Sequence, residues 1–109
     1  MTWSVTASSS GAGFPATSIS TIITSTGNGT FVFLIDMSNM VSGDLFSVRL
    51  FTSVASTALV QVWKGTWNNP QINGVKISPP VAADTVFSAT FESITGSTSE
   101  GFPWKLLSI

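Results

Sequence analysis

The segment 84–94, with the sequence DTVFSATFESI, predicts the fold class most clearly. Its apolar positions alternate with small or β-branched ones, and one face carries Phe87, Ala89 and Phe91. Such alternation is typical of a β-strand with one buried face. A second segment, residues 30–36 (TFVFLID), is apolar on both faces. We therefore expect it to form a central strand, covered on both sides.

Further extended segments lie on either side of these two, separated by turn residues about every ten positions. They comprise residues 1–6, 17–24, 45–52, 58–64 and 102–109, and residues 71–78 as a strand or a short hairpin around Asn73-Gly74. Turns are predicted at residues 26–29 (TGNG) and 42–44 (SGD), and Pro79-Pro80 indicates an edge or a crossing loop. No stretch keeps a helical period for three turns. The sequence predicts one all-β domain, an antiparallel sandwich of seven or eight strands, jelly-roll-like or immunoglobulin-like.

Two parts of unequal size are expected within the 109 residues. Residues 1–15 form an N-terminal arm, whose segment 7–15 (ASSSGAGFP) has the small and turn-forming residues of a loop. The arm is either flexible or adds a strand to the sheet of a neighbouring subunit. Residues 16–109 form the sandwich domain, which is an ordinary size for a single core.

The composition is unusual in its lack of charge. Charged residues make up 8% of the chain, the net charge is -1 and the mean hydropathy is +0.42. Soluble domains usually carry about 25% charged residues, which keep copies apart in water. Here Ser, Thr and Asn must supply most of the polar surface. We infer that protein neighbours cover much of this surface, with homo-oligomers among the expected assemblies.

The same inventory excludes several classes of function. Four basic residues are too few for a nucleic-acid or membrane-surface site, and no apolar run approaches the ~20 residues that cross a bilayer. Without His, Ser has no usual base beside it, and without Cys there is no thiolate metal site. Asp36, Asp44 and Asp84 lie at the ends of predicted strands, where Asp usually stabilises turns. We expect no catalytic residue, no metal and no cofactor.

Tryptophan is the main source of candidate binding residues. The pattern of residues 102–109 places Trp104 in the core, whereas Trp63 lies on the strand 58–64. Trp67 is expected in a loop, residues 65–70 (GTWNNP), beside two asparagines. Trp is common at interface hot spots because it buries a large area and keeps one hydrogen-bond donor. Three roles remain open for Trp67: a partner interface, a plug of the core, or a stacking contact to a glycan.

Arg49 is a cation on an otherwise apolar predicted strand. It is expected either to pair with Asp84 or Glu92 across strands, or to form a salt bridge to a neighbouring subunit. The predicted interface residues are Trp3, Phe14, Arg49, Trp63 and Trp67.

The order of several short motifs resembles a group of small proteins of tailed bacteriophages. In the first half these motifs are Gly27-Asn28-Gly29-Thr30-Phe31, Asp36-Met37-Ser38, Ser42-Gly43-Asp44 and Arg49. In the second half they are residues 78–84 (SPPVAAD), 87–90 (FSAT), Gly96 and 102–107 (FPWKLL). The resemblance covers residues 17–109 and is best after Ser78. Residues 58–77 match poorly and carry fewer charges than expected of relatives.

The resemblance implies a structural part of a virion rather than an enzyme. The expected function is capsid decoration: the protein binds the major capsid protein and stabilises the shell. It is then made in the host cytoplasm and resides on the capsid surface. Two alternatives remain: a neck, tail or fibre-base component that binds other virion proteins, and a carbohydrate-binding adhesion module.

Overall fold

A computed structural model describes residues 3–9, 19–53, 58–96 and 101–109 of the chain. These residues form strands, turns and loops, without a helix. The strands are β1 (Ser4–Ser9), β2 (Ile19–Thr26), β3 (Gly29–Asp36), β4 (Leu45–Thr52), β5 (Val60–Asn68), β6 (Val75–Ile77), β7 (Val81–Ala83), β8 (Val86–Thr95) and β9 (Trp104–Ser108).

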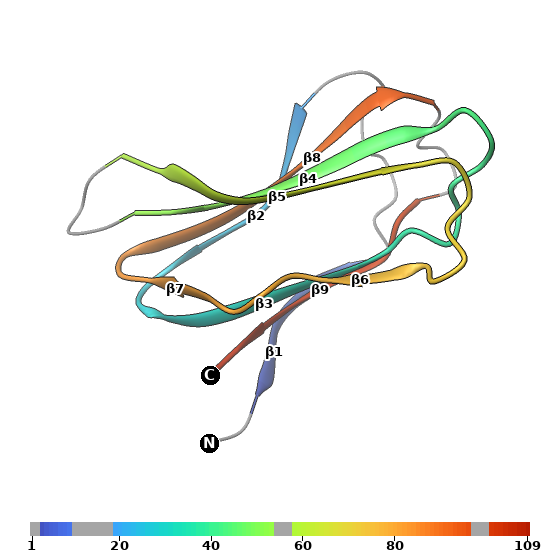
Figure 1. The fold of residues 1–109 in the computed structure, drawn as a ribbon. Helices are drawn as coiled ribbons and strands as arrows, with labels where there is room; N and C mark the ends of the chain where they lie inside the picture. The colour runs from blue at the N-terminus through green and yellow to red at the C-terminus, as the bar shows by residue number, and fades with distance from the viewer. Residues whose placement is uncertain (1–2, 10–18, 54–57, 97–100) are drawn as a thin grey trace.

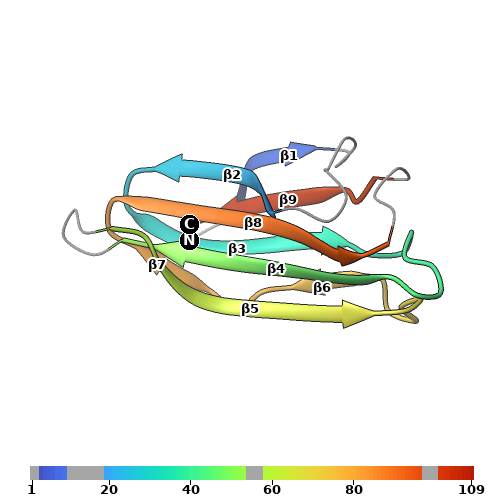
Figure 2. The same ribbon diagram turned by 90° about the horizontal axis from the view of Figure 1, so that it is seen from above.

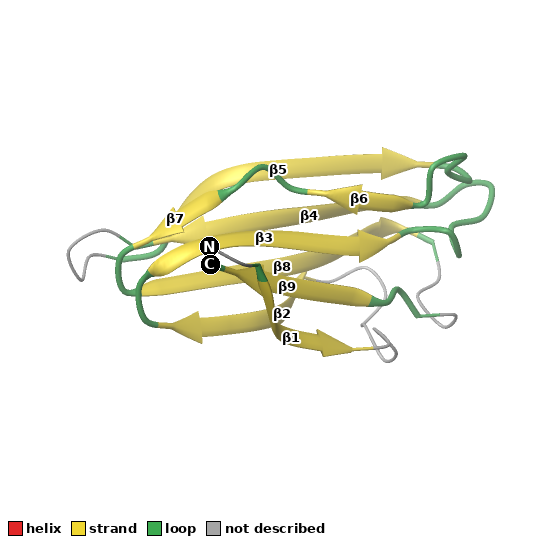
Figure 3. Cartoon of the chain, turned by 90° about the horizontal axis from the view of Figure 1, so that it is seen from below, coloured by secondary structure: helices red, strands yellow, loops and turns green. Residues whose placement is uncertain are grey.

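The strands form two antiparallel sheets that pack face to face (Figure 1). Sheet A has the order β1-β9-β3-β6, with β7 also paired to β3. Sheet B has the order β2-β8-β4-β5. Figure 2 shows sheet B from above, and Figure 3 shows sheet A from below, with β1 and β2 along one side of the sandwich. The predicted all-β antiparallel sandwich is confirmed.

The order of the strands is that of a jelly roll. From β1 to β9, and with β6 and β7 taken together, successive strands belong to sheets A, B, A, B, B, A, B and A. Both pair with β3, β6 through residues 34–36 and β7 through residues 29–31, so they occupy one position in sheet A. The nine strands therefore fill the eight positions of this architecture, and of the two predicted topologies the jelly roll is present.

Ser78 joins β6 to β7 where Pro79-Pro80 interrupts the pairing. Proline has no N–H to donate to a ladder, so a regular strand cannot continue through this point. Ser78 pairs with Phe33 on β3: its N–H donates to the Phe33 carbonyl at 2.9 Å, and its Oγ accepts the Phe33 N–H at 2.9 Å. The buried backbone of β3 thus keeps its partners beside the interruption.

The core lies between the two sheets and is rich in aromatic rings. Phe31 of sheet A stacks on Phe87 of sheet B, with ring centroids 4.9 Å apart. Phe102 contacts Phe46 and Phe91, at 5.1 and 5.6 Å between centroids. The fully buried large side chains are Phe33, Phe46, Phe87, Phe91, Phe102, Ile35, Met37, Leu50, Leu106 and Val48. Trp104 is buried among them, as predicted.

Several boundaries differ from the prediction and strand β7 was not predicted; two of the differences, at β1 and β5, bear on predicted features. Strand β1 continues to Ser9, although a loop was expected from Ala7, because residues 4–9 pair with β9 of the same chain. This part of the predicted arm therefore belongs to the sandwich, and residues 10–15 lie outside the described residues. Strand β5 continues to Asn68, although a loop was expected from Gly65. Gly65 fits here because it leaves space for the side chains of its strand neighbours.

Candidate interaction surface

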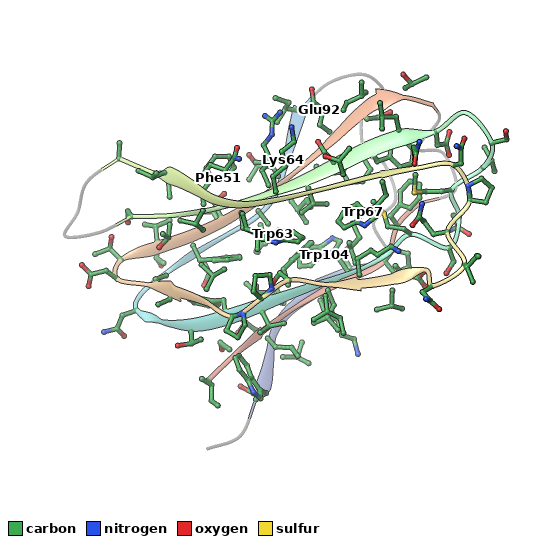
Figure 4. All side chains as sticks on the ribbon, viewed as in Figure 1. Phe51, Trp63, Lys64, Trp67, Glu92 and Trp104 are labelled. Carbon is green, nitrogen blue, oxygen red and sulfur yellow. The ribbon has the colours of Figure 1, made fainter. Side chains whose placement is uncertain are left out.

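Trp63 and Trp67 both project from β5 into the space between the sheets (Figure 4). They are four residues apart and therefore share a face of the strand, with Gly65 between them. Their ring centroids are 6.3 Å apart. A Cβ atom on Gly65 would clash with the rings of both Trp67 and Trp63, so both indoles cover the glycine.

This arrangement favours the core role among the three that were open for Trp67. Both indoles are partly buried and pack against the hydrophobic core. Asn69, expected to border a glycan site, instead accepts a bond from the Gly43 N–H at 3.0 Å through Oδ1. Its own N–H donates to the Asp44 carbonyl at 2.9 Å. The prediction that Trp67 lies in a loop is wrong, and its side chain closes the sandwich along β5.

Arg49 lies on the outer face of sheet B and forms an ion pair within the chain. Its Nη2 is 3.1 Å from Oε1 of Glu92 on β8, and each side chain is 26% exposed. The Ser47 hydroxyl donates to the same Glu92 oxygen at 3.4 Å. Lys64 lies opposite Arg49 on β5. The predicted cross-strand pairing with Glu92 is confirmed, and the Arg49 guanidinium already has a partner in the isolated protein.

The two interface residues predicted near the N-terminus are placed differently. Trp3 directly precedes β1 and is exposed. Phe14 lies outside the described residues. Trp3 therefore adds an exposed aromatic side chain at the β1 side of sheet A.

Sequence reasoning did not identify a further candidate site, the apolar outer face of sheet A. Leu107 on β9 lies opposite both Val5 on β1 and Val32 on β3. Leu34, two residues after Val32, lies opposite Ile77 on β6. Directly opposed residues of an antiparallel pair point to the same side of the sheet. We call this set the apolar face; it consists of Val5, Val32, Leu34, Val75, Ile77 and Leu107.

The apolar face is open to solvent across the width of the sheet. Val5 is 55% exposed, Val75 54% and Ile77 63%. Val32, Leu34 and Leu107 are half-buried in the middle. Sheet A forms the lower layer in Figure 1, and none of the described strands forms a further layer beneath it. A contiguous apolar surface rimmed by polar residues usually marks a site of protein association.

One end of the apolar face is hollowed and bordered by two charges. A depression of about 430 Å³ lies there, with Leu34, Val75 and Trp104 in its lining. Lys105 and Asp36 also line it. The Asp36 carboxylate accepts hydrogen bonds from the hydroxyl and the N–H of Ser38, which hold the pKa of Asp36 below its ordinary value. The depression therefore presents one cation and one ionised acid beside an apolar floor.

A weak signal for the apolar face was present in the sequence. Residues 30–36 are apolar on both faces, which predicted a strand covered on both sides. In the structure the inner residues Phe31 and Phe33 are buried in the core, whereas Val32 and Leu34 lie on the outer face. The second cover that this pattern predicts is not supplied by the described residues of the chain.

The acidic residues stabilise turns where the structure shows their partners. Asp44 accepts a bond from the Val41 N–H at 2.8 Å, and Asp36 accepts from Ser38 as described. No group of three or more potential metal ligands occurs among the described residues. In the same part of the chain there is no helix long and apolar enough to span a membrane.

Comparisons of the chain with protein-family models, with curated proteins and with solved structures gave no match.

Proposed function

We propose that the protein is a structural component of a tailed-bacteriophage virion, and that it decorates the capsid by docking onto the major capsid protein through the apolar face of sheet A. The single observation that carries this proposal is that face: a row of aliphatic side chains, from Val5 to Ile77, that crosses four strands and remains open to solvent.

Three further observations support a protein partner. Only 8% of the residues are charged, and the ion pair Arg49–Glu92 on sheet B is already formed within the chain. The order of motifs resembles small phage proteins. The jelly roll is common in viral capsid and lectin domains, although a fold alone does not determine function.

The apolar face defines what the partner surface must offer. Its centre needs aliphatic or aromatic side chains, because burying apolar area is the main source of affinity at the core of an interface. At the hollowed end, an acidic group of the partner suits Lys105 and a basic or N–H donor suits Asp36. A footprint of about 1,000 Å² or more is needed for a stable contact.

Docking stabilises the capsid by mass action. A ligand that binds only the assembled shell adds about 2.7 kcal/mol per site at a hundredfold excess over its Kd. Because a shell offers many equivalent sites, small gains at each one raise the stability of the whole particle. No bond is made or broken, so this function requires no catalytic base.

The test is sedimentation of the purified protein with shells that lack it. We expect the protein to appear in the shell pellet at micromolar concentration and to raise the temperature at which the shells disassemble. Protein that stays in the supernatant contradicts decoration. Labelled protein that localises to the tail of complete particles supports the neck, tail or fibre-base alternative instead.

A further inference from the structure

The edges of the sandwich differ in how they are protected. An edge strand offers unpaired backbone groups to another chain, and natural proteins usually block it with charge, proline or shortness. Strand β6 has three residues, with Lys76 at its centre and Pro79-Pro80 just beyond its end. Strand β5 carries the exposed Lys64. Strand β2 is the other edge of sheet B; its eight residues include no charge and no proline, and its pairing with β8 has a bulge between Thr21 and Ile23.

The sequence of β2 is nearly the same in both directions. It reads ISTIITST from Ile19 to Thr26, and its reverse reads TSTIITSI. When two copies of β2 are placed antiparallel about its midpoint, Ser20 opposes Ser25, Thr21 opposes Thr24 and Ile22 opposes Ile23. Only the outermost pair, Ile19 with Thr26, joins unlike residues.

A β-bulge makes this pairing possible in three dimensions. A twofold axis perpendicular to a sheet requires opposed residues to lie on the same face. In a regular strand Thr21 and Thr24 lie on opposite faces, because three residues separate them. The register of β2 against β8 shifts between Thr21 and Ile23, so that Thr21 opposes Thr90 and Thr24 opposes Ser88. Thr90 and Ser88 share a face, and therefore so do Thr21 and Thr24.

The remaining positions follow the same symmetry. Ile22 and Ile23, at the centre of β2, both pack against the core and are only partly buried. The outer positions Ile19 and Thr26 oppose Glu92 and Val86, which lie on the outer face of β8. Ile19, Thr21 and Ile22 thus face the same sides of the sheet as Thr26, Thr24 and Ile23, their counterparts across the midpoint.

We propose that β2 pairs with β2 of a second copy, antiparallel about a twofold axis between Ile22 and Ile23. Sheet B then becomes one eight-stranded sheet across the dimer, with β2 and its counterpart at the centre. Two Thr21–Thr24 pairs on the outer face and the four central isoleucines on the inner face complete the contact. The apolar faces of both copies remain free, so this dimer does not depend on the proposed function.

The first test is the mass of the purified protein in solution. Sedimentation velocity without shells is expected to show twice the chain mass of 11.4 kDa at about 100 µM. A monomer at that concentration overturns the proposal. Shell binding is measured separately by pelleting, so a failed dimer and a failed decoration function are told apart.

The second test examines the register. The chain has no cysteine, so introduced thiols are the only ones present. Thr21→Cys and Thr24→Cys proteins mixed under oxidation are expected to form a disulfide-linked dimer, because positions 21 and 24 are directly opposed. Each variant alone forms far less, since like positions lie roughly 8 Å apart, beyond the reach of a disulfide. A mixture of Thr24→Cys with Thr66→Cys on β5 serves as the control.

A pair of charge variants completes the design. Thr21→Lys/Thr24→Lys places like charges opposite each other twice in the dimer, whereas Thr21→Lys/Thr66→Lys adds the same charge without that opposition. We expect the first variant to raise the dimer Kd at least about tenfold more than the second. A dimer that resists the first variant, or that forms no mixed disulfide, uses another surface and contradicts the proposal.

Discussion

The two outer faces of the sandwich differ in whether their side chains have partners. On sheet B, Arg49 pairs with Glu92, and the Thr24 and Ser88 hydroxyls lie 3.3 Å apart within hydrogen-bond distance. On sheet A, aliphatic side chains cover the corresponding surface, and Ile77 is 63% exposed. These polar groups on the outer face of sheet B therefore have partners within the chain, whereas the outer face of sheet A presents an apolar surface that suits association.

This difference leads to opposite expectations for substitutions. Substitution of Arg49 or Glu92 on the outer face of sheet B removes an interaction within the chain and lowers the free energy of unfolding. Changes at exposed positions of the apolar face leave that free energy nearly unchanged and weaken docking.

The double substitution Val5→Glu/Ile77→Glu tests the apolar face at its two sides. Both positions are more than half exposed, so the unfolding midpoint should change little. Two carboxylates buried without partners in an interface should weaken shell binding at least about thirtyfold, equivalent to about 2 kcal/mol. Pelleting with shells measures this, and Thr66→Glu/Asn68→Glu, exposed on sheet B, is the matched control. Equal loss in both variants would mean that net charge, not the apolar face, controls binding.

Ser78→Ala tests the hydrogen bond that the Phe33 N–H of β3 donates to the Ser78 hydroxyl, at the edge of the apolar face. Without the hydroxyl, the buried N–H of Phe33 loses the acceptor that lies 2.9 Å away. An unsatisfied buried donor costs about 1–3 kcal/mol, so the urea midpoint should fall accordingly. Ser78→Thr retains the hydroxyl and is the control. A midpoint unchanged by the alanine variant would show that another group satisfies the Phe33 N–H.

The next prediction concerns how much the ion pair of Arg49 with Glu92 on sheet B contributes to the free energy of unfolding. A double-mutant cycle with Arg49→Met and Glu92→Gln should give a coupling energy of about 0.5–1 kcal/mol, decreasing in salt because both groups are partly exposed. The Arg49 Nε is buried without a hydrogen-bond partner, which keeps the expected value modest. The single variants should still pellet with shells. Loss of shell binding by the Arg49→Met variant would indicate that the docking surface lies on sheet B.

The smallest expected effect concerns Asp36, at the hollowed end of the apolar face. Hydrogen bonds from Ser38 lower the pKa of Asp36 below its ordinary value of 3.8. Their contribution to the stability of the folded protein is therefore fully present above that pH, and it is lost as the pH falls through the folded pKa. Ser38→Ala removes the hydroxyl bond, and the pKa of Asp36 should rise toward its ordinary value. The stability difference at neutral pH should stay within about 0.5 kcal/mol and vanish in acid. An NMR pH titration of the Asp36 carboxyl measures the pKa, and an unchanged value contradicts the assigned cause.

The sequence predicted the fold class well because alternation reports which residues are buried. Strand β4 has the predicted bounds, and Phe87, Ala89 and Phe91 are fully buried. Alternation failed at Gly65, where a turn-forming residue lies inside a strand because two indoles occupy the space over it. The apolar face was not predicted, because it arises only when β1, β9, β3 and β6 are brought side by side. Pairing between segments so distant in sequence cannot be read from any one of them.

Hydroxyl-radical labelling of the shell-bound protein, analysed by mass spectrometry, shows whether the capsid covers the apolar face of sheet A. We expect Leu34, Leu107 and Ile77, on the outer face of sheet A, to be labelled less when the protein is bound to the shell. Phe51 and the 42% exposed Ile94, on the outer face of sheet B, should be labelled as in the free protein. If Phe51 and Ile94 are protected while the labelling of Leu34, Leu107 and Ile77 is unchanged, the apolar face is not the docking surface.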